Sequence, residues 1–224
     1  MERKNLRLIS EIHQVNKFGF TEFPEIYEKY ICEFRDIEIN LLEIGVGGYS
    51  DPNDGGHSLR MWKDYFSRGH INGIDFYDKT ALEENRIKIF KGSQADEIFL
   101  DEVYKQIGKP HIIIDDGSHV CSDVITTFTF FFPKLKDNGV YIIEDLGTSY
   151  WPQFGGGFGE NTSMNFLKRL TDCLNHKEFL IQDYEPNYFD HHITSIHFYR
   201  NVAIICKGDN TKESLSVSNG RLKI

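Results

Sequence analysis

Short apolar, β-branched runs alternate along the chain with polar segments of helical length. Five such runs precede the C-terminal third, and they span residues 40–46, 70–76, 86–90, 111–115 and 139–145. Two of the segments between them, 58–66 and 123–136, carry apolar residues at helical spacing. Because strand–helix–strand alternation requires crossover connections, we predict an α/β protein whose parallel sheet has helices on both faces.

The second predicted helix has a mixed composition. Residues 126–132 read Thr-Thr-Phe-Thr-Phe-Phe-Phe, which by itself favours a strand. We interpret 123–136 as a helix because it must cross over between two parallel strands. Pro133 lies inside it and is expected to end or kink it, since proline cannot donate a backbone hydrogen bond.

The C-terminal part has a different pattern. Two strand-like runs, 194–199 and 202–206, are joined by only two residues and predict an antiparallel hairpin. Five parallel strands and this hairpin make a seven-stranded, mostly parallel sheet of Rossmann-like type. That outline is typical of class I methyltransferases dependent on S-adenosylmethionine (SAM) rather than of dehydrogenases. We divide the chain into a helical lead-in, the main domain and a polar tail, at residues 1–38, 39–209 and 210–224.

Composition narrows the class of protein. The chain has 224 residues, enough for one α/β domain, and its 25 basic and 34 acidic residues give a net charge of −9. This charge argues against binding to nucleic acid or to an anionic membrane surface. No apolar run approaches the roughly 20 residues of a membrane span, and no signal-peptide core follows the start. The four cysteines form no CxxC pair, so we expect reduced thiols and a cytoplasmic protein.

A glycine-rich turn follows the first predicted strand. The segment Glu43-Ile44-Gly45-Val46-Gly47-Gly48 would let the backbone turn tightly and approach a ligand. Ser50 interrupts the Gly-x-Gly-x-x-Gly pattern of dinucleotide sites, whereas an acidic residue two positions before the first glycine is typical of SAM sites. A carboxylate also suits the methionine ammonium of SAM better than a pyrophosphate. An ordinary strand-to-loop turn is the alternative.

Polar residues follow the second and third strands as well. Asp75 ends the second strand, where its carboxylate could accept both ribose hydroxyls of an adenosine or could cap the next turn. Ser93 and Gln94 follow the third strand and are placed to face the adenine. The pair Glu43 and Asp75 carries more weight than either residue alone, because both lie at the carboxyl ends of neighbouring strands.

The strongest chemical signal comes from the ends of the fourth and fifth strands. One end reads Asp115-Asp116-Gly117-Ser118-His119, and the other reads Glu144-Asp145. Four carboxylates at one buried edge repel each other unless protons or a cation intervene. A hard divalent ion with oxygen ligands, such as Mg²⁺, meets that need. Helix caps and solvated turn residues are the alternative.

His119 lies on the same loop as these carboxylates. Imidazoles change charge near neutral pH and can take a proton from a hydroxyl held nearby, so we predict a general base here. The chain has nine histidines. We interpret His191, His192 and His197, near the final hairpin, as structural or rim residues.

These motifs together resemble the metal-dependent sugar O-methyltransferases of the mycinamicin type and, more distantly, the cephalosporin-hydroxylase-like group. The resemblance covers roughly residues 8 to 208. It is carried by Leu42-Glu43-Ile44-Gly45-Val46-Gly47-Gly48, Gly56-His57-Ser58-Leu59-Arg60-Met61-Trp62, Gly73-Ile74-Asp75, Ile114-Asp115-Asp116-Gly117-Ser118-His119, Ile143-Glu144-Asp145-Leu146 and Thr148-Ser149-Tyr150-Trp151-Pro152.

The resemblance implies a role for each matching position. Mg²⁺ would be held by Asp116, Glu144 and Asp145, and His119 would be the general base. Tyr150 and Trp151 would form a wall of the acceptor site. The residues implied to hold SAM are Glu43, Gly45, Gly47, Ser58, Asp75, Ser93, Gln94 and Asp115.

The leading hypothesis is therefore a SAM- and Mg²⁺-dependent O-methyltransferase acting on a sugar or glycoside of a natural product or surface glycan. The resemblance also implies a homo-oligomer. A catechol-like diol is the alternative acceptor, because a metal-chelating diol is all that the carboxylates demand. A Rossmann oxidoreductase and a non-catalytic SAM-binding module are the rivals from other classes. The glycine-rich loop 155–159 is either a lid over the acceptor or a loose surface loop.

Overall fold

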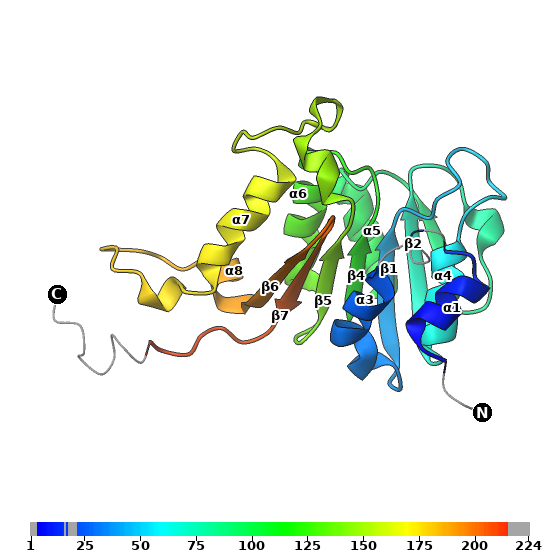
Figure 1. Cartoon of the computed structure of the whole chain (residues 1–224), viewed down its shortest axis with the longest axis horizontal. Coiled ribbons are helices and arrows are strands. Elements are labelled where there is room, and N and C mark those ends of the chain that lie inside the picture. The colour runs from blue at the N-terminus through cyan, green and yellow to red at the C-terminus, as the bar shows by residue number, and fades with distance from the viewer. Residues whose placement is uncertain (1–3, 16, 18–21, 215–224) are drawn as a thin grey trace.

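One mixed sheet forms the centre of the protein. The computed structural model describes residues 4–15, 17 and 22–214, and the described chain forms seven strands. The strands are β1 (Ile39–Ile44), β2 (Gly69–Asp75), β3 (Ile87–Lys91), β4 (Ile112–Asp115), β5 (Val140–Ile143), β6 (Ile193–Tyr199) and β7 (Val202–Lys207). Their order across the sheet is β3-β2-β1-β4-β5-β7-β6 (Figure 1). The predicted seven-stranded sheet is confirmed.

The direction of the strands places the candidate site. Strands β1 to β5 are parallel, whereas β7 runs antiparallel to β5, and β6 runs antiparallel to β7. From β1 the chain moves outward to β3 and then returns to place β4 on the other side of β1. Open α/β sheets bind ligands at the carboxyl edge of such a reversal. The predicted site residues lie at or just beyond the carboxyl ends of β1 to β5, at that edge.

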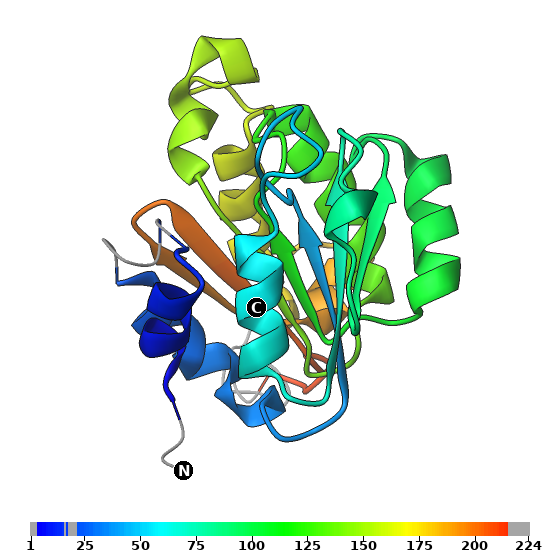
Figure 2. The same cartoon turned by 90° about the vertical axis from the view of Figure 1, so that its right-hand side faces the viewer.

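Helices cover both faces of this sheet. They are α1 (Leu6–Ile12), α3 (Phe23–Ile31), α4 (His57–Tyr65), α5 (Glu97–Ile107), α6 (Cys121–Phe131), α7 (Ser163–Cys173) and α8 (Tyr188–His192). Residues of α1, α3 and α4 share one buried apolar cluster, and residues of α5, α6 and α7 share the other. Figure 2 shows the first group, blue to cyan, on one side of the sheet.

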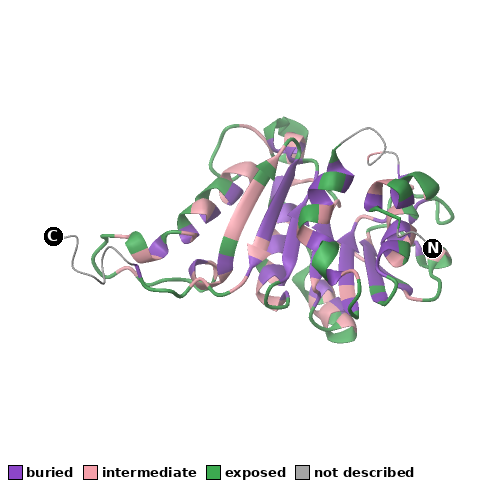
Figure 3. Ribbon diagram, turned by 60° about the horizontal axis from the view of Figure 1, so that its bottom comes forward, coloured by how far each residue is buried: buried purple, intermediate pink, exposed green. Residues whose placement is uncertain are grey.

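The sequence of β4 explains why both faces are covered. Ile112 and Ile114 belong to one apolar cluster and Ile113 to the other, because successive side chains of a strand point to opposite faces. All three are fully buried, and Figure 3 shows the central strands as the most buried part of the chain. A continuous apolar run is the pattern expected of such a strand.

The helix of mixed composition is also confirmed. It begins at Cys121 and ends at Phe131, and a 3₁₀ turn containing Pro133 follows it. Phe128 on its buried face packs against the rings of Phe132 and Tyr141, with ring centroids 5.0 and 4.9 Å apart. The phenylalanines therefore reflect burial against the sheet rather than strand structure.

The N-terminal lead-in packs over the first face of the sheet. Tyr27 of α3 stacks on Trp62 of α4, with 5.8 Å between ring centroids, and both side chains are fully buried. This packing carries the hydroxyl of Tyr27 toward the carboxyl edge. The lead-in is helical at α1 and α3, as predicted, whereas residues 1–3, 16, 18–21 and 215–224 lie outside the described part of the chain. No described helix is both long and apolar enough to cross a membrane.

Candidate active site

A cavity of about 970 Å³ opens at the carboxyl edge of the sheet. Ile44, Ile74 and Gly92, each within one residue of the ends of β1, β2 and β3, lie in its wall. At one end it reaches the loop that follows β4. The predicted site residues that line it are Gly45, Gly47, Ser58, Asp75, Ser93, Gln94, Asp116, His119 and Asp145. Glu43, Asp115 and Glu144 are not among the described residues that line the cavity. All three are buried, and each stands directly before a lining residue in the sequence.

The glycine turn brings two strand ends into close contact. Gly45 has φ +93°, and a Cβ atom there would lie 2.1 Å from the carbonyl oxygen of Asp116. Gly47 has φ +82°, and no atom lies within 4 Å of where its Cβ would be. The first glycine is needed for packing between the β1 and β4 loops. The second leaves the cavity wall open to a ligand.

Glu43 is a buried carboxylate with an unused oxygen. Its Oε2 atom has no hydrogen-bond partner, and the residue is 1% exposed. Burial raises the pKa of Glu43 to about 8, against the lowering effect of Lys17, and Asp116 and Glu144 raise it further. A hydrogen bond from Ser58, which lines the cavity, lowers it. A buried carboxylate of this kind is suited to receive the ammonium group of a ligand.

This raised pKa predicts a pH-dependent stability. A carboxyl that titrates near pH 8 when folded and near 4.5 when unfolded stabilises the folded state below the lower value. That stabilisation is lost as pH rises through 8. We expect Glu43→Gln to remove this pH-dependent stabilisation. The free energy of unfolding should then fall less steeply as pH rises, by at most about 1.4 kcal/mol per pH unit.

Urea titrations at pH 5.5, 7 and 8.5 measure this difference. The matched control is Glu102→Gln, at an exposed position of α5. This variant should show the same dependence of unfolding free energy on pH as the unchanged protein. Parallel profiles for the unchanged protein and Glu43→Gln would contradict the assignment of the titrating group.

Asp75 and Gln94 hold the cavity wall together. Asp75 accepts backbone hydrogen bonds from Val46 (2.9 Å, to Oδ2) and from Tyr77 (2.8 Å, to Oδ1). A carboxylate has about four acceptor positions, so its predicted role toward a ribose stays open. Gln94 donates from Nε2 to Asp115 Oδ1 at 3.1 Å and accepts at Oε1 from the amide of Ser118 at 2.6 Å. Its amide is therefore engaged within the protein.

Asp115 lies beneath the cavity. It is 1% exposed, and burial raises its pKa to about 7, although the hydrogen bond from Gln94 lowers it. Thr127 of α6 accepts from the same Gln94 amide at 3.0 Å. Asp115 and Gln94 thus connect the end of β4 to the loop after β3 and to α6. We regard them as fixing the wall that a cofactor would contact.

Three candidate metal ligands converge at one end of the cavity. Asp116, His119 and Asp145 each offer a ligand atom, and these atoms lie within 4.8 Å of one another. The Nε2 atom of His119 is 3.6 Å from Oδ2 of Asp145. The loops after β4 and β5 bring them together, because these strands are neighbours in the sheet. The prediction that the two strand ends meet is confirmed.

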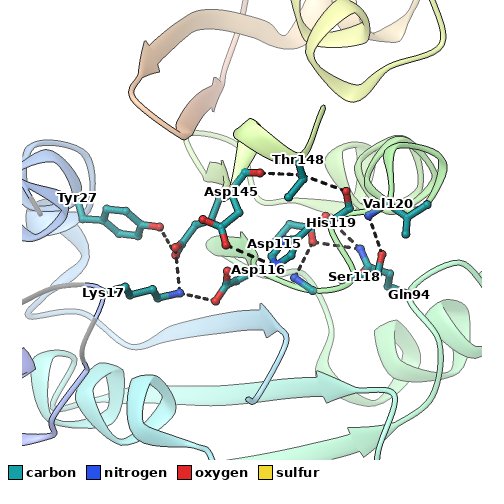
Figure 4. Close-up of polar contacts among 12 residues, drawn as sticks. Lys17, Tyr27, Gln94, Asp115, Asp116, Ser118, His119, Val120, Asp145 and Thr148 are labelled. Atoms are coloured by element: carbon teal, nitrogen blue, oxygen red, sulfur yellow. Dashed lines mark hydrogen bonds and ion pairs between the residues drawn. The ribbon is translucent and has the colours of Figure 1, made fainter. Parts of the chain in front are cut away.

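The backbone at two of these residues is unusual. His119 has φ 58° and Asp145 has φ 50°, in the left-handed region that costs free energy for most residues. The hydroxyl of Thr148 lies 2.7 Å from the carbonyl oxygen of Asp145 and 3.3 Å from that of His119 (Figure 4). This residue therefore connects the two loops and holds their side chains at the cavity.

Glu144 lies apart from this group. Its side chain is buried, its Oε1 atom accepts a 2.6 Å hydrogen bond from Tyr27, and its Oε2 atom is 2.9 Å from Nζ of Lys17. The ammonium of Lys17 also pairs with Asp116 (Figure 4). Burial lowers the pKa of Lys17, but the carboxylates of Glu144 and Asp116 outweigh it, so the pKa is raised.

The predicted acceptor residues are not among the described residues that line the cavity. Tyr150 and Trp151 are 40% and 51% exposed and follow β5 in short 3₁₀ turns. The ring of Phe158 lies 5.5 Å from that of Tyr150. The amide of Gly157 donates to the carbonyl of Ser149 at 2.8 Å, so the glycine-rich loop is joined to these turns at its start.

Comparison with known proteins adds independent findings. No family model matches the chain. It is 41% identical over 214 residues, 93% of its length, to mycinamicin VI 2''-O-methyltransferase of Micromonospora griseorubida. It is 42% identical over 202 residues, 89% of its length, to 8-demethyl-8-alpha-L-rhamnosyl tetracenomycin-C 2'-O-methyltransferase of Streptomyces olivaceus. These matches cover 54% and 53% of the relatives, so the chain spans about half of their length.

A solved structure agrees with the sequence matches. The MycE methyltransferase of the mycinamycin biosynthetic pathway, in complex with Mg and SAH, superimposes with a TM-score of 0.91 at 40% identity. The alignment covers 96% of this chain and 57% of that one. The chain therefore has a Rossmann-like fold and belongs to the family of these SAM-dependent O-methyltransferases. The close homologues of the chain are the sugar O-methyltransferases of natural-product pathways, which confirms the resemblance drawn from its motifs.

Proposed function

We propose that this chain binds SAM and a divalent ion and transfers a methyl group to a hydroxyl of a sugar or glycoside. The observation that carries the proposal is the convergence of Asp116, His119 and Asp145 at one end of the cavity. The names of the relatives support the acceptor class, because one of them specifies 2'-O-methylation of a rhamnosyl compound. The homo-oligomer implied by the resemblance belongs to the same proposal, and light scattering tests it.

The residues present suit both bound groups. The unpartnered Oε2 atom of buried Glu43 matches the methionine ammonium of SAM, and the open face at Gly47 admits a ligand against the backbone. Two carboxylates, Asp116 and Asp145, offer oxygen donors to a hard divalent ion and would hold it, with the imidazole of His119 beside them. Glu144, predicted as the third ligand, would need to exchange its contact with Lys17.

The chain's own residues would then act as follows. Bound Mg²⁺ would supply a Lewis acid, and bound SAM would supply an activated methyl group. Glu43 and the glycine turn would orient the donor, while Asp116 and Asp145 orient the acceptor. His119 Nε2 would take the proton of the attacking hydroxyl as the oxygen–methyl bond forms and the bond between the methyl group and the sulfonium sulfur breaks, with S-adenosylhomocysteine as the leaving group. Much of the acceleration would come from placing the two reactants in line.

A turnover screen tests the proposal. SAM and Mg²⁺ are incubated with the protein and with glycosides, nucleotide sugars or catechols, and S-adenosylhomocysteine formation is measured. We expect turnover with a sugar-containing acceptor and none in EDTA. Turnover with catechols alone would establish the alternative acceptor class. Absence of SAM binding in calorimetry would overturn the proposal.

A location of the protein in the cytoplasm is part of the same proposal. It is supported by the four free cysteines, which a reducing compartment would maintain.

A further inference from the structure

Lys17 lies where a cation is expected. Its ammonium is 2.9 Å from Oε2 of Glu144 and pairs with Oδ2 of Asp116. Both carboxylates are predicted metal ligands, and Lys17 also lines the cavity that we assign to SAM. Figure 4 shows the ammonium directed toward Asp116, and the hydroxyl of Tyr27 donates to the other carboxylate oxygen, Oε1, of Glu144.

The surroundings of this ammonium are strongly acidic. Glu43, Asp116 and Glu144 all act to raise the pKa of Lys17, so three carboxylates share one positive charge. Glu43 and Glu144 are buried, and buried carboxylates repel one another more strongly than exposed ones. A positive charge at this position is therefore stabilised by the acidic cluster, and a divalent ion would be stabilised by the same oxygens.

Two cations cannot use the same pair of oxygens. Mg²⁺ needs ligand oxygens at about 2.0–2.1 Å, and an ammonium hydrogen-bonded to the same atoms would lie within a few Å of it. At that separation the two like charges repel each other strongly, because the site is partly buried and water screens them poorly. An ion that takes Asp116 together with Glu144 must therefore displace the ammonium of Lys17.

We propose that Lys17 is a built-in competitor of the divalent ion. Its ammonium pairs with Asp116 and Glu144 and withdraws from them when the ion binds, which sets the ion affinity of the site. This inference rests on the proposed metal site. It assigns Lys17 a positioning role: its ammonium holds the two carboxylates together and in place until the ion arrives.

Ion binding without turnover tests this role. Calorimetric titration with Mn²⁺ or Mg²⁺, in the absence of SAM, compares the unchanged chain with Lys17→Met and Lys17→Arg. We expect Lys17→Met to bind the ion at least about tenfold more tightly and Lys17→Arg to bind like the unchanged chain. Lys17→Gln, which is shorter by one atom but keeps a donor without the charge, replaces the methionine variant if that variant fails to fold. Lys105→Met, at an exposed ion pair with Asp101, is the control.

A second readout follows the displaced side chain itself. Labelling with an amine-reactive reagent, followed by mass spectrometry, should modify Lys17 faster in the presence of Mg²⁺ than in its absence. Unchanged labelling, or equal ion affinity in Lys17→Met, would overturn the inference and leave the metal site standing. If neither protein binds an ion, both the inference and the metal role of the proposed function are wrong.

Discussion

Replacing His119 by alanine is expected to abolish methyl transfer while SAM still binds. The imidazole Nε2 lies 3.6 Å from Asp145 Oδ2, inside the group that would hold the acceptor, and we assign it the acceptor proton. A positioned general base contributes a factor of about 10²–10⁴ to a rate, and we expect kcat to fall by that amount. Steady-state assays measure kcat, and calorimetry measures the dissociation constant of SAM.

The left-handed backbone of His119 determines which variants are informative. Alanine is strained at φ 58°, whereas asparagine tolerates this region, so His119→Asn removes the base with less effect on the loop. Both variants should be inactive, and added imidazole should restore part of the activity of His119→Ala. His70→Ala, at an exposed position on β2, is the matched control. A near-normal kcat in His119→Asn would exclude His119 as the base.

The sheet was predictable from local pattern alone. Runs such as Ile112-Ile113-Ile114 are strand-forming and apolar on both faces, so they identify a buried parallel strand without further information. The final hairpin follows from two strand-like runs joined by two residues. Element ends were less accurate: the fifth run was extended to Asp145, but β5 ends at Ile143 because Asp145 turns left-handed.

The acidic edge was predictable because topology brings strand ends together. Once β4 and β5 are neighbours and parallel, Asp116 and Asp145 must lie close to each other, and His119 follows on the same loop. The sequence did not distinguish which carboxylates reach the cavity. Glu43 and Asp115 are the last but one and the last residue of their strands, and both are buried beneath the lining residues.

The contacts of Glu144 could not be predicted in this way. Lys17 precedes its partner Asp116 by 99 positions, and Tyr27 precedes Glu144 by 117. Both partners come from the lead-in, whose position depends on the packing of Tyr27 against Trp62. Neither residue belongs to a motif that signals a site. A lone lysine or tyrosine in an amphipathic helical region is typical of an ordinary surface or core position.

The second large effect is expected at Asp116, the carboxylate shared by the metal group and by Lys17. Asp116→Asn removes one anionic ligand while keeping the size of the side chain. We expect kcat to fall about a hundredfold or more, since Lewis-acid stabilisation is worth several kcal/mol. The residual activity should no longer respond to EDTA or added Mg²⁺, whereas the unchanged enzyme should lose activity in EDTA and regain it with Mg²⁺.

The same variant separates the metal role from a merely structural one. If Asp116 only paired with Lys17, its amide would alter stability but leave the dependence on Mg²⁺ intact. If it holds the ion, Asp116→Asn should also weaken Mn²⁺ binding in calorimetry, while SAM affinity changes little. Asp137→Asn, at a carboxylate that is 85% exposed, should match the unchanged enzyme in every assay. Full activity of the unchanged enzyme in EDTA would remove the metal from the mechanism altogether, because the carboxylate edge would then work without a bound ion.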